Sequence, residues 1–174
     1  MAASDIPYLR LLLANAIAHW KLVFGITATR PSISYLSSFS FGVHSLAAAE
    51  LSLQPHEEAA AFSALEHTST FLCVNQAHAV LEKLGNPLSD ETINAAFQIA
   101  RLLRNSFAHD PFSPTWLFGN SWDNKVLEVP GVIRIDTTGL KGQRVIRAHY
   151  GGPLAILKLT QYVDSVAESQ EAAT

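Results

Sequence analysis

Three residues in the second half of the chain carry side chains that could act together on a phosphate group: Arg104, Asn105 and His109. An arginine can neutralise a phosphate oxygen through paired N–H donors, and an imidazole can accept or donate a proton. Asn105 and His109 are four residues apart, so they share one face if the segment is helical. Arg101 lies one turn earlier and would add a second positive charge. The spacing therefore predicts an anion site near the end of a helix.

The segment that carries these residues has the pattern of an amphipathic helix. Ser89 is the expected N-cap, and Pro111 disfavours helical geometry at Asp110, so we expect the helix to end near His109. At about 100° per residue, Arg104 falls inside the arc formed by the apolar residues Ile93, Ala96, Ala100, Leu103 and Phe107. An arginine at the edge of a core needs an anion, a carbonyl group or a second chain as its partner.

A structural role for the same residues explains the spacing equally simply. Arg104 would bond carbonyl groups across a bundle, Asn105 would cap a neighbouring turn, and His109 would cap its own helix. Structural polar networks also bring charged groups together, so spacing alone favours this interpretation over a catalytic one.

The segment Leu103-Arg104-Asn105-Ser106-Phe107-Ala108-His109-Asp110 resembles the Arg-x4-His motif of the HEPN superfamily. This resemblance implies a helical bundle, commonly a homodimer in which the motifs of two protomers face one another. Many members are metal-independent ribonucleases of toxin–antitoxin, abortive-infection and CRISPR systems, and others are non-catalytic binding or regulatory domains. The Asn-x-Phe-Ala-His wording is also similar to the mannitol-operon repressor branch. Pro111 stands where the HEPN toxins that a partner nucleotidyltransferase modifies have a tyrosine, which argues against that form of regulation.

Two functions follow from the resemblance. In the first, the chain is a HEPN endoribonuclease acting as a toxin or phage-defence effector, with Arg104, Asn105 and His109 as its catalytic residues and attack by the ribose 2′-OH. In the second, it is a non-catalytic HEPN-like dimer that binds a regulator, a nucleotide, a nucleic acid or a protein. Expected partners are a second copy of the chain, RNA, and an antitoxin or regulatory protein.

A basic region further along the chain could support phosphate binding. The whole chain has a net charge of −3, which argues against broad nucleic-acid binding, but residues 125–158 hold six Lys and Arg residues and only two acidic ones. We therefore expect Arg101, Lys141, Arg144 and Arg147 to contact substrate, the alternative being a hairpin with solvated basic side chains. Trp116, Phe118 and Trp122 could stack on bases, although such aromatic residues more often belong to the core.

Composition argues against metal sites, cofactors and membrane insertion. Cys73 is the only cysteine, and no two histidines have the helical spacing of a zinc site, so no metal or cofactor is expected. The first 20 residues make a poor signal peptide, and no run of about 18 apolar residues occurs, so we expect a cytoplasmic protein. Because 48% of the residues are hydrophobic, some apolar surface is expected to be covered by a second copy.

The hydrophobic pattern predicts a mainly α protein, a single HEPN-like domain over 1–174. We expect a bundle of four to five helices, with a small β-hairpin or meander over about 126–149 before the last helix. The expected helices span residues 6–24, 33–53, 55–84, 89–109 and 154–167. An ordered loop is expected over 111–124, and a flexible tail over about 168–174.

Overall fold

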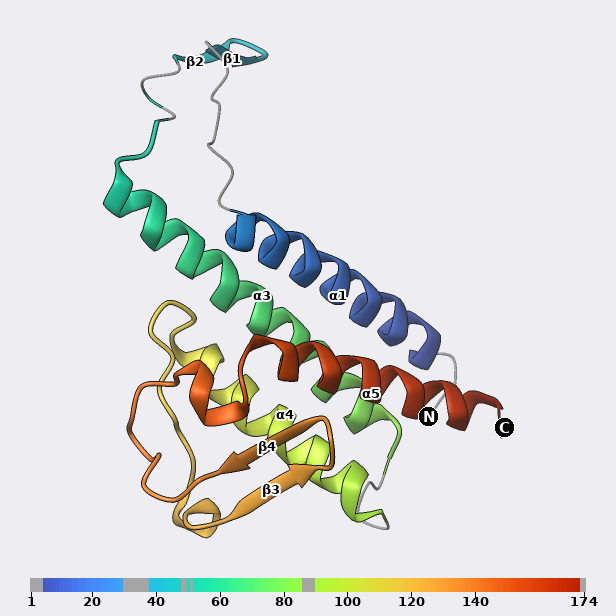
Figure 1. The fold of residues 1–174 in the computed structure, drawn as a ribbon. Coiled ribbons are helices and arrows are strands. Elements are labelled where there is room, and N and C mark those ends of the chain that lie inside the picture. The colour runs from blue at the N-terminus through green and yellow to red at the C-terminus, as the bar shows by residue number, and fades with distance from the viewer. Residues whose placement is uncertain (1–4, 30–37, 48–49, 51, 86–89, 173–174) are drawn as a thin grey trace.

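A computed structural model describes residues 5–29, 38–47, 50, 52–85 and 90–172 of the chain. Within these ranges the protein is a bundle of four long helices with a small antiparallel hairpin before the last one, which confirms the predicted fold class (Figure 1). The helices are α1 (Ile6–Thr29), α3 (Pro55–Lys83), α4 (Glu91–His109) and α5 (Pro153–Ala172).

Helix α3 lies at the centre of the bundle and packs against α1, α4 and α5 (Figure 1). Leu13 of α1, Leu81 of α3, Leu103 of α4 and Leu159 of α5 are all fully buried and belong to one continuous core. Each such side chain contributes roughly 1.5–3 kcal/mol relative to leaving it in water. The core therefore fixes all four helices against one another, including the helix that carries the Arg-x4-His segment.

The hairpin before the last helix is shorter than predicted. Strands β3 (Val126–Val129) and β4 (Ile133–Asp136) pair antiparallel, with Val129 opposite Ile133; β3 packs on α4, and β4 contacts α5. The expected β region over 126–149 is therefore wrong beyond Asp136. The buried Thr137 hydroxyl interrupts the pattern, because it donates to the Trp122 carbonyl and accepts from the Lys125 amide. Residues 137–146 are irregular, and a short 3₁₀ helix, η4 (Arg147–Tyr150), follows.

The helix predicted over 33–53 is wrong over residues 38–47. The described part of this segment contains a second hairpin, formed by β1 (Ser38–Phe41) and β2 (His44–Ala47), which stands away from the bundle (Figure 1). Residues 33–37, 48–49 and 51 lie outside the described residues. Ser38 to Phe41 alternate polar and aromatic side chains with the period of a strand. Gly42 has φ +60, a left-handed conformation that a helix interior does not contain and a tight turn requires.

Two helix boundaries differ from the sequence expectations, and a third agrees with them. Helix α1 continues through Gly25 to Thr29. The N-cap of α4 is Asp90, whose carboxylate accepts from the amides of Thr92 (2.8 Å) and Ile93 (3.0 Å), and Ser89 lies outside the described residues. The end of α4 matches the prediction, because Asp110 is extended, with φ −154 and ψ 98.

The predicted flexible tail over 168–174 is wrong up to residue 172, because α5 continues to Ala172. Arg10 of α1 holds this end of α5 through Nε to Asp164 (2.8 Å) and Nη1 to Glu171 (2.6 Å). The two carboxylates raise the pKa of the guanidinium above its ordinary value. A polar segment that looks disordered in sequence is therefore helical because a distant arginine neutralises it.

Helix α1 is long and apolar enough to cross a membrane by length and composition, although Arg10 and Lys21 interrupt its apolar residues. In this fold its inner residues Leu13 and Trp20 are buried in the bundle. Length and composition are weak support for a membrane span, because the core helix of a soluble protein meets the same test.

Replacing Arg10 tests how much the ion pairs to α5 stabilise the fold. We expect Arg10→Ala to lower the free energy of unfolding by about 1 kcal/mol, less at high salt, because two partly exposed pairs are lost. Urea unfolding followed by circular dichroism measures this change. The control is Glu168→Ala, whose carboxylate is 71% exposed and 4.0 Å from Arg10, and which should have an effect within about 0.5 kcal/mol. Equal effects of the two variants would contradict the assignment.

Candidate anion site on helix α4

Arg104 is held between α4 and α3. Its Nε donates to the side-chain oxygen of Asn75 at 3.2 Å, and the side chain is half-buried. Leu103 and Phe107, on either side in sequence, are fully buried and fix the rotation of the helix. Arg104, at the edge of the predicted core, therefore has Asn75 of the neighbouring helix as its polar partner.

His78 adds a second polar group beside Arg104. It lies one turn after Asn75 on α3, is buried, and stacks on Phe97 with ring centroids 4.9 Å apart. Burial lowers the pKa of His78, and the positive charges of Arg104 and Arg101 lower it further, while Glu82, 3.8 Å from its Nδ1, opposes the shift. His78 is therefore neutral near pH 7. No pattern in the sequence marks this residue, because its role arises only when α3 is placed beside α4.

The arginines of the described chain fall into two groups. Arg10, Arg134 and Arg147 are ion-paired with carboxylates. The others have no carboxylate partner within the described ranges, and two of the three lie on α4: Arg101, Arg104 and Arg144. The surface of α4 around Arg101 and Arg104 is therefore a region of positive charge that no side chain of the described fold neutralises.

The remaining motif residues lie at the C-terminal end of α4. Asn105 is half-buried, and His109 is exposed in the last turn. Asp110 holds the turn that follows, since its carboxylate accepts from the amides of Phe112 (2.9 Å) and Ser113 (3.0 Å). Arg104 and His109 are five residues apart and so point about 140° apart around the helix. A single chain consequently presents Arg104 toward α3 and His109 on a different face.

His67 of α3 lies against the same end of α4. Its ring packs edge-to-face on Phe107, with centroids 5.9 Å apart. Burial lowers the pKa of His67 and Arg144 adds to the shift, while Asp110 and the backbone of Phe112 oppose it. Arg144, a predicted substrate contact, is therefore placed near the end of the motif helix, where a backbone bridge to Thr115 holds its segment.

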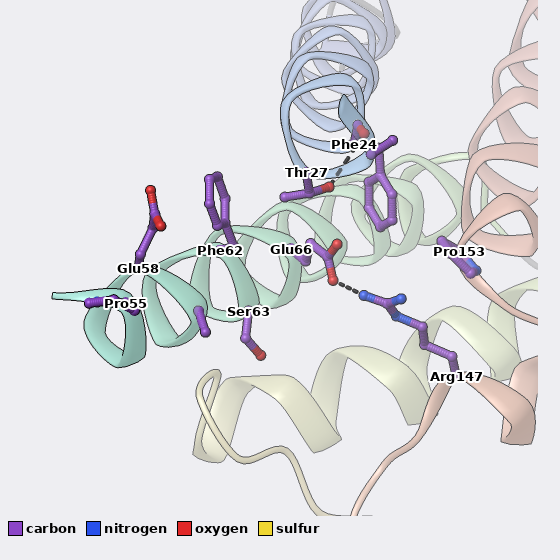
Figure 2. Close-up of a pocket in the computed structure, with 11 residues that line it drawn as sticks. Phe24, Thr27, Pro55, Glu58, Phe62, Ser63, Glu66, Arg147 and Pro153 are labelled. Carbon is purple, nitrogen blue, oxygen red and sulfur yellow. Dashed lines mark hydrogen bonds and ion pairs between the residues drawn. The ribbon is translucent and has the colours of Figure 1, made fainter. Parts of the chain in front are cut away.

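The other two predicted substrate contacts lie elsewhere. Lys141 donates to the side chain of Asn120 at 2.5 Å. Arg147 forms an ion pair with Glu66 inside a cavity of about 580 Å³ between the end of α1, the first half of α3 and the start of α5. Figure 2 shows Glu66 and Arg147 pointing toward one another, and the guanidinium carbon lies 6.0 Å from the Phe24 ring centre. The charge of Arg147 is thus neutralised within the fold.

The aromatic residues after the motif are structural, as the sequence favoured. Trp116 is fully buried, and its indole N–H donates to Nδ1 of His149 at 2.9 Å. Phe118 and Trp122 are partly buried against the same core.

No group of three or more His, Cys, Asp or Glu residues in the described ranges is arranged to hold a metal ion. Cys73 is buried with its sulfur 3.4 Å from the Ala16 carbonyl, and burial raises the pKa of the thiol to about 12. This cysteine is therefore protonated and unreactive at neutral pH.

Comparison with protein-family models, curated proteins and solved structures gave no match to the chain. The likeness to HEPN proteins therefore rests on the motif residues alone.

The neutral state of His78 predicts how stability depends on pH. The folded-state pKa is below the ordinary value of 6.5, so the unfolded chain binds more protons as the pH falls through that value. The contribution of His78 should be complete above about pH 6.5 and should be lost progressively as the pH falls toward the folded-state pKa. Urea unfolding between pH 8 and pH 5 measures this. His78→Gln should reduce the pH dependence, and an unchanged profile would show that His78 does not cause it.

Proposed function

We propose that the protein is a metal-independent endoribonuclease of HEPN type, acting as a toxin or phage-defence effector in the cytoplasm. The observation that carries this proposal is the uncompensated charge on α4. Within the described residues, Arg101 and Arg104 have no carboxylate partner, although the chain as a whole is acidic. A fixed cationic site of this kind favours a phosphate group, and the exposed His109 lies at the end of the same helix.

The proposed reaction is an internal phosphoryl transfer. His109 removes the proton from a ribose 2′-OH, the 2′-oxygen attacks the adjacent phosphorus, and the bond from phosphorus to the 5′-oxygen breaks. The leaving oxygen takes up a proton, so the products are a 2′,3′-cyclic phosphate and a 5′-hydroxyl. Arg104 stabilises the negative charge that develops on the phosphate oxygens, and Asn105 orients the phosphate or the imidazole.

The proposed reaction also requires a second copy of the chain. Because Arg104 and His109 point about 140° apart, one protomer does not direct both side chains at one phosphate. A facing motif from a partner subunit would complete the site and supply the proton for the leaving oxygen. An antitoxin or regulatory protein that covers this surface would silence the enzyme.

A second candidate function has its own support. The bond from Arg104 to Asn75 and the neighbouring stack of His78 on Phe97 form a well-packed polar layer between α3 and α4. Such a layer is sufficient to explain the arginine without catalysis. In this alternative the chain is a non-catalytic HEPN-like dimer, and the positive surface of α4 binds a nucleotide, a nucleic acid or an acidic protein.

RNA cleavage in EDTA is the first test of the proposed activity. We expect the wild type to cleave tRNA or total RNA to fragments with cyclic-phosphate ends and to leave DNA intact, since DNA lacks the 2′-OH. His109→Ala should lower the rate at least 10²-fold. The matched control is His56→Ala, which replaces another exposed helical histidine and should retain activity. Intact RNA with all three proteins at high concentration would refute the nuclease and leave the binding module.

Asn75→Asp separates the two functions further. The substitution places a carboxylate about where the amide oxygen now lies 3.2 Å from Arg104 Nε, so it neutralises Arg104 while keeping its position. The fold should be as stable as the wild type or more so, by urea unfolding. Under the nuclease proposal, cleavage should fall at least tenfold, because the charge no longer acts on the phosphate. Undiminished cleavage by a stable Asn75→Asp protein would remove Arg104 from the mechanism.

A further inference from the structure

The outer face of α1 is unusually apolar for a helix at the surface of a bundle. Its exposed side chains include Tyr8 (61% exposed), Leu11 (58%) and Leu22 (62%), together with Ala14 and Ala18. Lys21 is the only charged residue on this face among those described, and the exposed polar residues Asn15 and Thr29 lie on it as well. A surface helix normally turns a polar face to water, and a helix that is apolar on all sides is normally covered on all sides.

The order of large and small residues along this face indicates what covers it. Leu11, Ala18 and Gly25 are spaced seven residues apart, nearly two full turns, so they form one line along the helix. If a second α1 is placed antiparallel with the twofold axis at Ala18, each Leu11 lies opposite Gly25 of the partner subunit. Ala18 then lies opposite Ala18 of the partner subunit. The line is therefore complementary to its own reversed copy, as a twofold interface requires.

Gly25 provides an independent reason for this arrangement. It lies inside α1, where glycine costs about 1 kcal/mol relative to alanine. A Cβ atom added at Gly25 would meet nothing within 4 Å, and its φ is not positive, so nothing in the described chain requires a glycine there. Close approach of a second backbone or side chain is the remaining physical reason for glycine at such a position.

We propose that α1 pairs with α1 of a second copy of this chain, antiparallel and centred on Ala18. One helix face is smaller than the roughly 800 Å² per partner of a standard interface, so the dimer should be reversible and depend on concentration. The pairing is independent of the nuclease proposal. Helices α1 and α4 each pack on α3, and the pairing of two α1 helices involves none of Arg104, Asn105 and His109. Its test needs no RNA and can fail or succeed without affecting the proposed function.

Cysteine cross-linking tests the register directly. Ala18→Cys should form a disulfide-linked dimer under mild oxidation, because the two positions meet at the axis. Leu11→Cys alone should not, because its two copies would lie roughly 21 Å apart along the helices at 1.5 Å per residue. A mixture of Leu11→Cys and Gly25→Cys proteins should form the mixed dimer. The native Cys73 is buried and protonated, so it gives no background. A self-linked Leu11→Cys dimer, or no linked species from Ala18→Cys, would overturn the proposal.

Size changes at the same line give a second, independent measurement. Gly25→Leu should leave the isolated chain folded, because the added side chain enters open space, but should weaken dimerisation at least tenfold by clashing with Leu11 of the partner subunit. The exchange Leu11→Ala with Gly25→Leu should restore part of the affinity. Analytical ultracentrifugation over a range of concentrations measures the association, and circular dichroism checks the fold.

A matched pair of charge variants controls for surface effects. Leu22→Glu should weaken the association through α1 at least tenfold, whereas Leu154→Glu, at a residue of α5 with 64% exposure against 62% for Leu22, should leave that association unchanged. Equal masses for Gly25→Leu, Leu22→Glu and wild type at every concentration would overturn the proposal. A monomeric wild type that instead co-sediments with phosphatidylcholine vesicles would assign the apolar face to a lipid surface and equally overturn it.

Discussion

The structure depends on the burial of α3, the helix that contacts the three other long helices of the described fold. The second half of α3 is buried on several sides, with Cys73, Val74, Ala77, Val80 and Leu81 all removed from water. A polar residue on such a helix cannot be left without a partner. Asn75 meets this need by accepting a hydrogen bond from Arg104 of α4, and His78 stacks on Phe97 of α4 with Glu82 of its own helix 3.8 Å from its Nδ1. The position of Arg104 follows from this requirement.

Elements that depend on local patterns could be predicted from the sequence, whereas elements that depend on long-range contacts could not. The signals for α4 are local: its hydrophobic periodicity, its acidic first turn and Pro111 after its end. The presence of this helix and its last residue could therefore be predicted from the sequence. The sequence predicts a helix in place of the hairpin at Ser38–Ala47 because the alanines at 47–49 have high helix propensity. There, the period of two and the left-handed Gly42 were the decisive signals. The helical end of α5 could not be predicted, because Arg10, more than 150 residues away in sequence, holds it.

Some residues of the candidate site could likewise be predicted from the sequence, and others could not. The sequence identified Arg104, Asn105 and His109 from spacing and resemblance, and it favoured a core position for Trp116, which the structure confirms. It could not identify Asn75, His78 or His67, since their importance arises only when α3 is placed beside α4. It also could not separate the free arginines from Arg147, because pairing with Glu66 joins residues on different elements. Long-range contacts thus decide which of several similar basic residues can bind an anion.

The positive charges of the described residues are neutralised at one helix contact and left without carboxylate partners at another. Where α5 crosses α1, Arg10 of α1 and carboxylates of α5 neutralise one another, whereas α4 keeps two arginines without such partners. Neutralising Arg104 internally would have needed only one carboxylate on α3, and Asn75 occupies the place where it would stand. An amide there orients the guanidinium without cancelling its charge. The charge of Arg104 therefore stays available to an external anion, as the proposed function requires, while the hydrogen bond still fixes the position of the guanidinium between α3 and α4.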